Sequence, residues 1–266
     1  MSASLPQFHR PTFDDTRMYV LVWGASGCGK TTLAVTAPGT KAFVQFDNQG
    51  VTSIANRSDY HVLDLSGTTF RTAMMEFSKM DPFGMRAFIK ANPDVETIVI
   101  DSITTLSFMA LQYAVTIAGG KSTIEVPGMN GYGTRNNVMR RAVQVIMQIC
   151  SELGKHLIVI THEAAPDKDA EGNTIEITMS LSSSLANDVS LRFNEVWHMK
   201  DTGKERQIYV RPFGVWKPMK TRMFDTNQHV QFKWHYNADT LQGEGIADWF
   251  TQWQQNGGKK IPLPKK

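Results

Sequence analysis

Unbroken apolar runs alternate with stretches of helical periodicity over the first 160 residues of the chain. The apolar runs lie at 18–23, 41–46, 61–65, 97–100 and 157–163. Helical patterns lie at 33–37, in two stretches within 68–91, at 103–117 and at about 136–153. Strands that are buried on both faces are apolar throughout, because neither face meets water. The alternation therefore predicts an α/β fold, with a mainly parallel twisted sheet and helices on both faces.

Beyond residue 163 the apolar runs become shorter. Strands are predicted at 175–179, 195–199, 207–211 and 230–236, with a hairpin turn at 171–173 and a last helix at about 246–253. Such short strands are expected to add to the sheet in antiparallel fashion towards the C-terminus. The pattern divides the chain into a polar arm at 1–15, one domain at 16–256 and a flexible basic tail at 257–266. The tail is either a solvated end or a contact for nucleic acid.

A glycine-rich loop follows the first predicted strand. It has the form G-x-x-x-x-G-K-[ST] and is followed directly by a helical pattern. Its backbone N–H groups are expected to surround a polyphosphate, with Lys30 reaching the β- and γ-phosphates. A chance match is the alternative, but the order of strand, loop and helix is the context that the motif requires. The predicted nucleotide contacts are Gly24, Ser26, Gly27, Cys28, Gly29, Lys30, Thr31 and Thr32.

Composition narrows the class of protein without identifying it. Of the 266 residues, 41% are hydrophobic and 20% are charged, which is typical of a globular protein. The net charge of +3 is compatible with an anionic partner but too small to indicate one. No apolar run is long enough for a membrane helix, the first fifteen residues do not resemble a signal peptide, and the two cysteines cannot form a disulfide framework. We therefore expect a cytoplasmic protein.

Asp101 directly follows the apolar run at 97–100, which is the arrangement of a Walker B motif. The buried strand would deliver this carboxylate to Mg²⁺, and the Thr31 hydroxyl would supply a second ligand. The alternative is that Asp101 caps the following helix, because Asp and Ser are both favoured there. Ser102 can serve as that cap and leave Asp101 for the metal.

Hydrolysis needs a group that activates or orients water on the γ-phosphate. The usual AAA-type layout has a glutamate straight after the Walker B aspartate, but Ser102 stands at that position. Asp47, which follows the strand at 41–46, is the best candidate; the alternative is that it belongs to an Asp-Asn-Gln-Gly turn. His162 ends another strand and is a candidate γ-phosphate sensor or a hydrogen-bonded structural histidine, and Glu163 competes for the sensor role.

Lys220 and Arg222 are separated by one residue, so on a strand their side chains would point the same way. A solvated basic edge is the simple interpretation. The functional interpretation is a pair of cations that reach the γ-phosphate bound to a neighbouring subunit and stabilise the charge that develops there.

Taken together, these motifs resemble the RecA-like P-loop ATPase core. The segments Thr161-His162-Glu163, Phe193-Asn194-Glu195-Val196 and Lys220-Thr221-Arg222 are closer still to the small phage RecA-like ATPases of single-strand annealing and recombination. The resemblance covers roughly residues 16–225. It implies an ATP- and Mg²⁺-dependent ATPase that forms a ring or filament and is located in the host cytoplasm if it is phage-encoded.

The resemblance also implies roles for individual residues. Asp47 stands where the family has its catalytic glutamate, with a shorter side chain, and His162 takes the place of the γ-phosphate-sensing glutamine. Lys220 and Arg222 would be the fingers that act between subunits, and the DNA-binding loops would lie at 119–133 and 164–190. Single-strand sites combine cations with aromatic rings, and the residues that come nearest to this are Tyr132, Arg135, Arg140 and Arg141. The alternative is that they form a solvated helix start.

Three functions therefore compete. The first is an oligomeric ATPase that acts on single-stranded DNA, with recombination proteins as further partners. The second is an ATP-dependent switch or assembly protein without nucleic-acid binding. A P-loop kinase is the third and weakest, because the chain has no arginine-rich lid segment and Lys220 and Arg222 lie too late in it.

Overall fold

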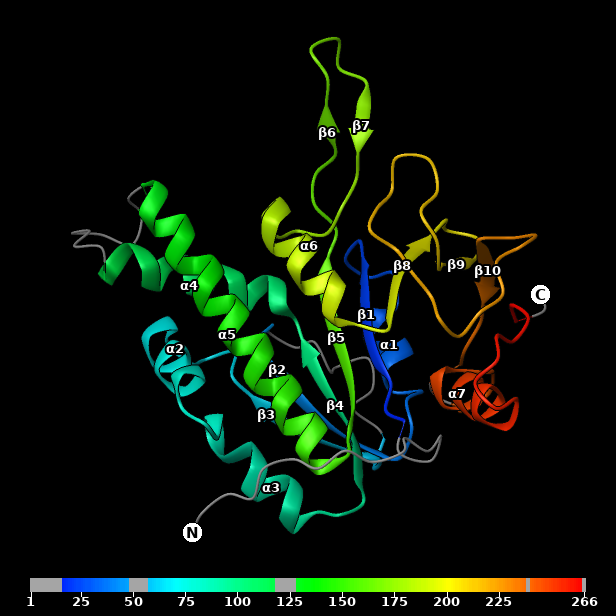
Figure 1. Ribbon diagram of the computed structural model, residues 1–266, viewed down its shortest axis with the longest axis horizontal. Coiled ribbons are helices and arrows are strands. Elements are labelled where there is room, and N and C mark those ends of the chain that lie inside the picture. The colour runs from blue at the N-terminus through cyan, green and yellow to red at the C-terminus, as the bar shows by residue number, and fades with distance from the viewer. Residues whose placement is uncertain (1–15, 48–56, 118–127, 238–239, 265–266) are drawn as a thin grey trace.

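The computed structural model describes residues 16–47, 57–117, 128–237 and 240–264, and within them eight strands form one sheet (Figure 1). Its order is β10-β9-β8-β1-β5-β4-β2-β3. The strands are β1 (Tyr19–Gly24), β2 (Thr40–Gln45), β3 (Tyr60–Asp64), β4 (Val95–Asp101), β5 (His156–His162), β8 (Glu195–Asp201), β9 (Arg206–Tyr209) and β10 (Gln231–Trp234).

The six strands from β8 to β3 in this order are parallel, and the other two are antiparallel. This arrangement confirms the predicted fold class. The carboxyl ends of all six parallel strands therefore meet at one edge of the sheet. Because β9 runs the opposite way, its first residue lies at that same edge, and so does the end of β10.

Helices cover both faces of the sheet (Figure 1). One face carries α2 (Phe70–Ser78), α3 (Met85–Ala91), α4 (Ile103–Ile117), α5 (Met129–Leu153) and α6 (Ser183–Arg192), with the short 3-10 turn η2 (Pro82–Gly84) between α2 and α3. The other face carries α1 (Lys30–Ala34) and α7 (Ile246–Gln255). Within these residues, no helix combines the length and the apolar character that a membrane crossing requires.

The two apolar clusters explain why the strands read as unbroken apolar runs. On β1, Leu21 and Trp23 pack in the cluster under α4 and α5, whereas Val20 and Val22 pack in the cluster under α1 and α7. Successive side chains of a strand point to opposite faces, so both sets must be apolar when both faces are covered.

Three segments differ from their predictions. The helix α5 begins at Met129 rather than near residue 136, so Tyr132 lies within a helix and not in the loop expected at 119–133. Residues 118–127 are outside the described part. The helix α6 was not predicted. The expected flexible tail packs instead on the sheet domain, where Ile261 is buried and exchanges backbone hydrogen bonds with Met223 and Asp225.

A hairpin projects from the carboxyl edge of the sheet. Its strands β6 (Asp167–Lys168) and β7 (Thr174–Glu176) pair in antiparallel fashion, and the turn falls at the residues predicted for it. In Figure 1 the hairpin extends well beyond the rest of the described chain. It begins directly after β5, so it is connected without interruption to the site described next.

Candidate active site

The glycine-rich loop and the predicted site residues Asp47, Asp101 and His162 meet at the carboxyl edge of the sheet. A cavity of about 330 Å³, which we name the strand-end pocket, is lined on one side by the glycine-rich loop and the start of α1. Its other lining residues are Asp47 after β2, Asp101 at the end of β4, His162 at the end of β5 and Arg206 at the start of β9. Because β5 lies between β1 and β4, His162 is held between the loop and Asp101.

The loop requires glycine at two positions for different reasons. At Gly24 a Cβ atom would lie 2.1 Å from the carbonyl oxygen of Met199, because the backbones of β1 and β8 approach closely. Gly29 has φ of +100°, in the left-handed region that other residues seldom adopt. Between them the loop wraps around the Lys30 ammonium, whose Nζ lies 2.9 Å from the Gly24 carbonyl and 2.6 Å from the Ala25 carbonyl.

Asp101 and Thr31 form a hydrogen-bonded pair within the pocket. The Thr31 hydroxyl donates to a carboxylate oxygen of Asp101 over 2.8 Å, and Asp101 is 4% exposed. Burial raises the pKa of Asp101 to about 6, and the negative charge of Asp47 acts in the same direction. Ser102 accepts a hydrogen bond from the Thr105 backbone at the start of α4, as expected of the cap that leaves Asp101 for another role.

The raised pKa of Asp101 predicts that the stability of the folded state depends on pH. In the absence of nucleotide, the folded state retains the Asp101 proton up to about pH 6, whereas the unfolded chain loses it near 3.8. The ionised carboxylate therefore destabilises the fold as pH rises through this range, by about 3 kcal/mol above it. Asp101→Asn keeps the acceptor for Thr31 and should unfold at a higher temperature than wild type at pH 8, with the difference shrinking at pH 4.5. Equal unfolding temperatures at pH 8 would contradict this prediction.

Asp47 is held in place by two contacts. Its carboxylate accepts a hydrogen bond from the Thr105 hydroxyl on α4, and its carbonyl accepts one from the Gln45 amide over 2.6 Å. The side chain is half-buried and lines the pocket. A carboxylate in this position is able to accept a proton from, or orient, a water molecule beside the loop.

His162 is half-buried between Ser102 and the loop. Its Nδ1 lies 3.4 Å from the Ser102 hydroxyl, and its backbone N–H donates to Thr104 over 2.9 Å. Burial lowers the pKa of His162, and the nearby charge of Lys30 lowers it further. The ring is therefore neutral at pH 7, with one nitrogen to donate and one to accept.

Glu163, the competing sensor candidate, has a different partner. Its carboxylate pairs over 2.7 Å with Nε2 of His198, which is buried against Trp23. Glu163 does not line the strand-end pocket as the described residues form it. The structure thus separates the two candidates: His162 faces the loop, and Glu163 ties the base of the hairpin to β8.

Lys220 and Arg222 lie beside β8 but outside the strand-end pocket of their own chain. They are not on a named strand, although Lys220 exchanges two backbone hydrogen bonds with Val196. The buried carboxylate of Glu195 accepts backbone hydrogen bonds from Arg222 over 2.7 Å and from Met223 over 3.0 Å. This buried anchor fixes the segment, and it leaves the Arg222 side chain exposed.

Arg206 is the pocket residue that sequence reasoning missed. Its guanidinium lies so close to the loop that a Cβ atom on Gly29 would be 3.1 Å from Cζ. Its Nε also lies 3.6 Å from a carboxylate oxygen of Asp201. The turn-forming sequence Thr202-Gly203-Lys204 was the available signal, because a tight turn there returns Arg206 to the edge where β8 ends.

We expect Arg206→Ala to weaken the binding of inorganic tripolyphosphate and of ATP by about tenfold each, since one cation near the phosphates is lost. Titration calorimetry measures both ligands. Arg211→Ala is the matched control. Arg211 lies just after the other end of β9, donates to Thr226 and is outside the pocket lining. Unchanged tripolyphosphate affinity in Arg206→Ala would show that this guanidinium does not serve the phosphates.

The four residues of the expected DNA site are spread over one helix. On α5, the Arg135 guanidinium lies 5.3 Å from the centre of the Tyr132 ring, which is partly exposed. Arg140 is paired with Asp188 of α6, and Arg141 approaches the sulfur of Met80. The structure therefore brings together only Tyr132 and Arg135 of the four. Arg135 also donates to the Asn136 side chain, so each of the three arginines has a partner within the chain.

A glycine-rich loop between β1 and α1, with an aspartate at the end of a nearby buried parallel strand, defines a P-loop nucleoside triphosphatase. A sequence profile described as AAA domain matches residues 16–233, and the chain belongs to this family. A search of curated proteins found no significant match. Membership of the AAA domain family indicates ATP binding and hydrolysis as the general activity.

The pocket also fits the Mg²⁺ that usually accompanies nucleotide in such domains. Thr31 and Asp101 offer two oxygen ligands that lie 2.8 Å apart, and oxygen is the ligand type that Mg²⁺ prefers. The described residues contain no group of three or more His, Cys, Asp or Glu side chains arranged for a metal. The remaining ligands would therefore come from phosphate oxygens and water, as is common for Mg²⁺.

Proposed function

We propose that this protein is a RecA-like ATPase that assembles into an oligomer, hydrolyses ATP at sites shared between subunits and acts on single-stranded DNA in recombination or annealing. One observation carries the proposal. The chain passes from His162 in the strand-end pocket through Glu163 into the projecting hairpin, so the nucleotide site and an exposed arm share one continuous segment. A change in contact at His162 would move the base of that arm.

In the proposed mechanism the loop and Lys30 hold the phosphates. Lys30 exchanges its carbonyl contacts for phosphate oxygens, which are stronger acceptors for an ammonium. Thr31 and Asp101 would hold Mg²⁺, which when bound would neutralise charge on the phosphates. Because the ionised form of Asp101 is costly in the buried pocket, the metal would also relieve an unfavourable charge.

Asp47 orients the attacking water and accepts its proton, while the neutral His162 contacts the γ-phosphate. The Thr105 hydroxyl keeps the Asp47 carboxylate aimed into the pocket, which offsets the shorter reach of aspartate compared with glutamate. His162 reports the γ-phosphate by gaining or losing one hydrogen bond, and Ser102 is its alternative partner.

The cations that stabilise developing charge would come from a neighbouring subunit. Lys220 and Arg222 lie outside the pocket of their own chain. The buried Glu195 carboxylate nevertheless fixes the backbone of Arg222, and backbone hydrogen bonds to Val196 fix that of Lys220. Burying Glu195 is costly, and this cost is offset by the hydrogen bonds that it makes to this segment. In an oligomer where the segment with Lys220 and Arg222 contacts the strand-end pocket of the next subunit, this rigid backbone would hold the two cations in place.

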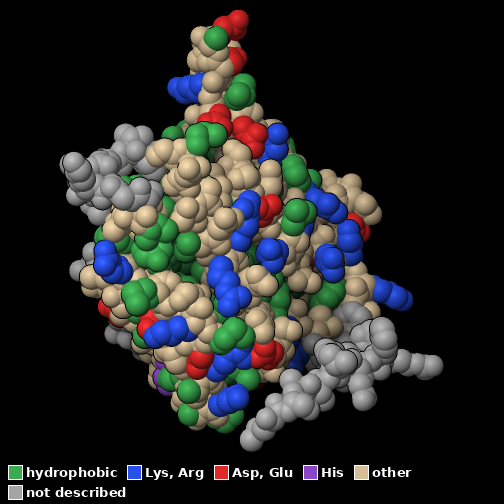
Figure 2. Space-filling model, turned by 60° about the vertical axis from the view of Figure 1, so that its left-hand side comes forward, with side chains coloured by type: hydrophobic (Ala, Val, Ile, Leu, Met, Phe, Trp, Pro, Cys, Tyr) green, Lys and Arg blue, Asp and Glu red, His purple; other side chains and the backbone are tan. Residues whose placement is uncertain are grey.

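Single-stranded DNA would lie along the first turns of α5. Tyr132 supplies a ring on which a base can stack, and Arg135 supplies a cation beside it. Contacts between Asn136 and the start of α6 connect this end of α5 to the segment that follows the hairpin. Figure 2 shows Lys and Arg side chains, with acidic side chains among them, across the face of the molecule below the projecting tip.

The acidic hairpin favours the second function, an ATP-dependent switch or assembly protein without nucleic-acid binding. Asp169 accepts hydrogen bonds from Glu171 and Asn173 in the turn, and acidic side chains mark the projecting tip in Figure 2. Such a tip repels phosphate backbones and suits a basic protein partner.

Single-stranded DNA distinguishes the two functions. For the proposed function we expect an oligonucleotide to raise phosphate release from ATP several-fold at 50 mM salt, and the effect to fall steeply by 300 mM salt. Double-stranded DNA of the same sequence is the control. An oligonucleotide that neither binds at low salt nor changes turnover would exclude the first function and leave the second.

A further inference from the structure

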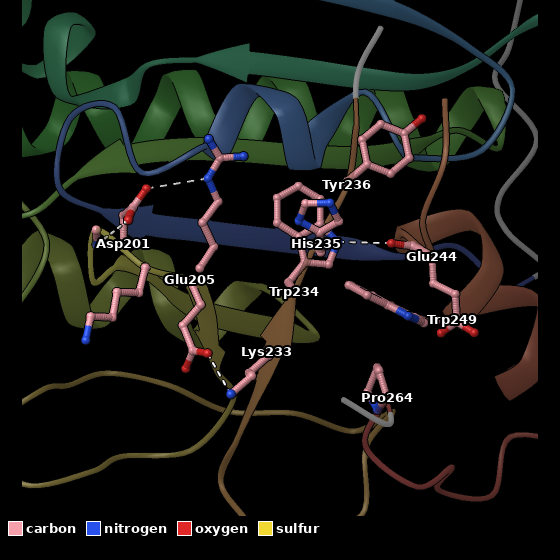
Figure 3. Close-up of a pocket in the computed structure, with 12 residues that line it drawn as sticks. Asp201, Glu205, Lys233, Trp234, His235, Tyr236, Glu244, Trp249 and Pro264 are labelled. Atoms are coloured by element: carbon pink, nitrogen blue, oxygen red, sulfur yellow. Dashed lines mark hydrogen bonds and ion pairs between the residues drawn. The ribbon is translucent and has the colours of Figure 1, made fainter. Parts of the chain in front are cut away.

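A second and larger cavity adjoins the strand-end pocket. It has a volume of about 680 Å³ and shares Arg206 with that pocket. We name it the aromatic pocket and define it by Arg206, Trp234, His235, Tyr236 and Trp249. Figure 3 shows these aromatic residues on β10, on the segment after it and on α7.

The sheet register explains why the two cavities are neighbours. Arg206 pairs with Asp201 on one side and with Trp234 on the other. These three residues therefore stand in a row across the carboxyl edge, next to the end of β1, where the loop begins. Residues 235 and 236 continue beyond that edge, on the side of the sheet that α1 and α7 cover.

The aromatic pocket has an apolar wall and a polar rim. The Trp234 and Tyr236 rings are parallel, with an angle of 2° and centroids 6.0 Å apart, and Trp234 is anchored by a hydrogen bond to the Glu244 carbonyl. Tyr236 is anchored by Arg57, whose guanidinium donates to its hydroxyl over 3.2 Å. At the rim Lys233 pairs with Glu205 over 2.6 Å. Further charged side chains line the cavity, namely Asp201, Lys204, Arg206 and Glu244. An apolar aromatic wall with polar groups beside it is typical of a small-molecule site.

We propose that the aromatic pocket binds the adenine base and ribose of ATP, with the base against the Tyr236 ring. This inference rests on the proposed nucleotide site and extends it. The strand-end pocket of about 330 Å³ takes a triphosphate, and the nucleoside needs an adjoining volume that Arg206 links to it. The half-buried ring of Tyr236 offers a face on which a planar base can stack.

The test compares ATP with inorganic tripolyphosphate, which has the phosphates but no base. Tyr236→Ala should weaken ATP binding about tenfold and change tripolyphosphate binding less than twofold, as measured by titration calorimetry. Tyr236→Phe keeps the ring and should bind ATP nearly as wild type does. Phe108→Ala removes an exposed ring on α4, outside both pockets, and serves as the matched control.

Other outcomes separate this inference from the proposed function. If wild type binds both ligands and Tyr236→Ala binds both unchanged, the aromatic pocket does not hold the base although the phosphate site stands. If wild type binds neither ligand, the proposed function itself fails. Should Tyr236→Ala not fold, photolabelling of wild type with 8-azido-ATP decides: adducts on the peptides containing 201–206, 231–236 or 244–249 support the inference, and adducts confined to other peptides overturn it.

Discussion

Replacing Lys30 by methionine is expected to abolish ATP binding and to lower phosphate release by at least about 100-fold. Lys30 is 6% exposed and its ammonium is surrounded by the loop. Among the described residues, no other lysine lines the strand-end pocket to substitute for it. Methionine retains the buried stem of the side chain and removes only the charge. Calorimetry with ATP and a phosphate-release assay measure the two effects.

The control for this experiment is Lys90→Met, which removes a charge from an exposed position on α3. Both variants should unfold at temperatures close to that of wild type, so that lost activity is not lost folding. Wild-type turnover in a folded Lys30→Met protein would contradict ATP hydrolysis at the strand-end pocket.

The second large effect is expected from Arg222→Ala. This variant should bind ATP with the affinity of wild type, because Arg222 does not line the pocket of its own chain. Its rate of hydrolysis should fall by at least about 100-fold, because a cation that acts on the transition state is lost. Lys217→Ala removes a nearby exposed cation paired with Glu176 and should hydrolyse ATP normally. Loss of ATP affinity in Arg222→Ala would contradict a role confined to hydrolysis.

The central part of the fold could be predicted because burial on both faces leaves a strong signal. Each of the strands β1, β2, β4 and β5 is a short apolar run, and each ends in a polar residue or the glycine loop. Parallel strands end at the same edge, so the meeting of Asp47, Asp101 and His162 followed from the strand assignment alone.

The elements that were missed lack such a signal. The helix α6 begins in a serine-rich stretch that is typical of a turn, and its buried face contains only three apolar residues, Leu185, Ala186 and Val189, beside Ser190. The first turn of α5 contains Gly131, which is buried by tertiary packing that outweighs its low helix propensity. The pairing of β8, β9 and β10 brings Arg206 to both pockets and Tyr236 to the aromatic pocket. The register of these antiparallel strands cannot be read from one sequence.

The central claim is that each ATP site is completed by a neighbouring subunit. It is tested most directly by mixing Arg222→Ala with Asp47→Asn, each nearly inactive alone, and measuring phosphate release from ATP. In an equal mixture that exchanges subunits, about a quarter of the interfaces combine an intact Asp47 with an intact Arg222. We therefore predict recovery to about a quarter of wild-type activity, and a mixture that exchanges subunits yet stays as inactive as its components would contradict the claim.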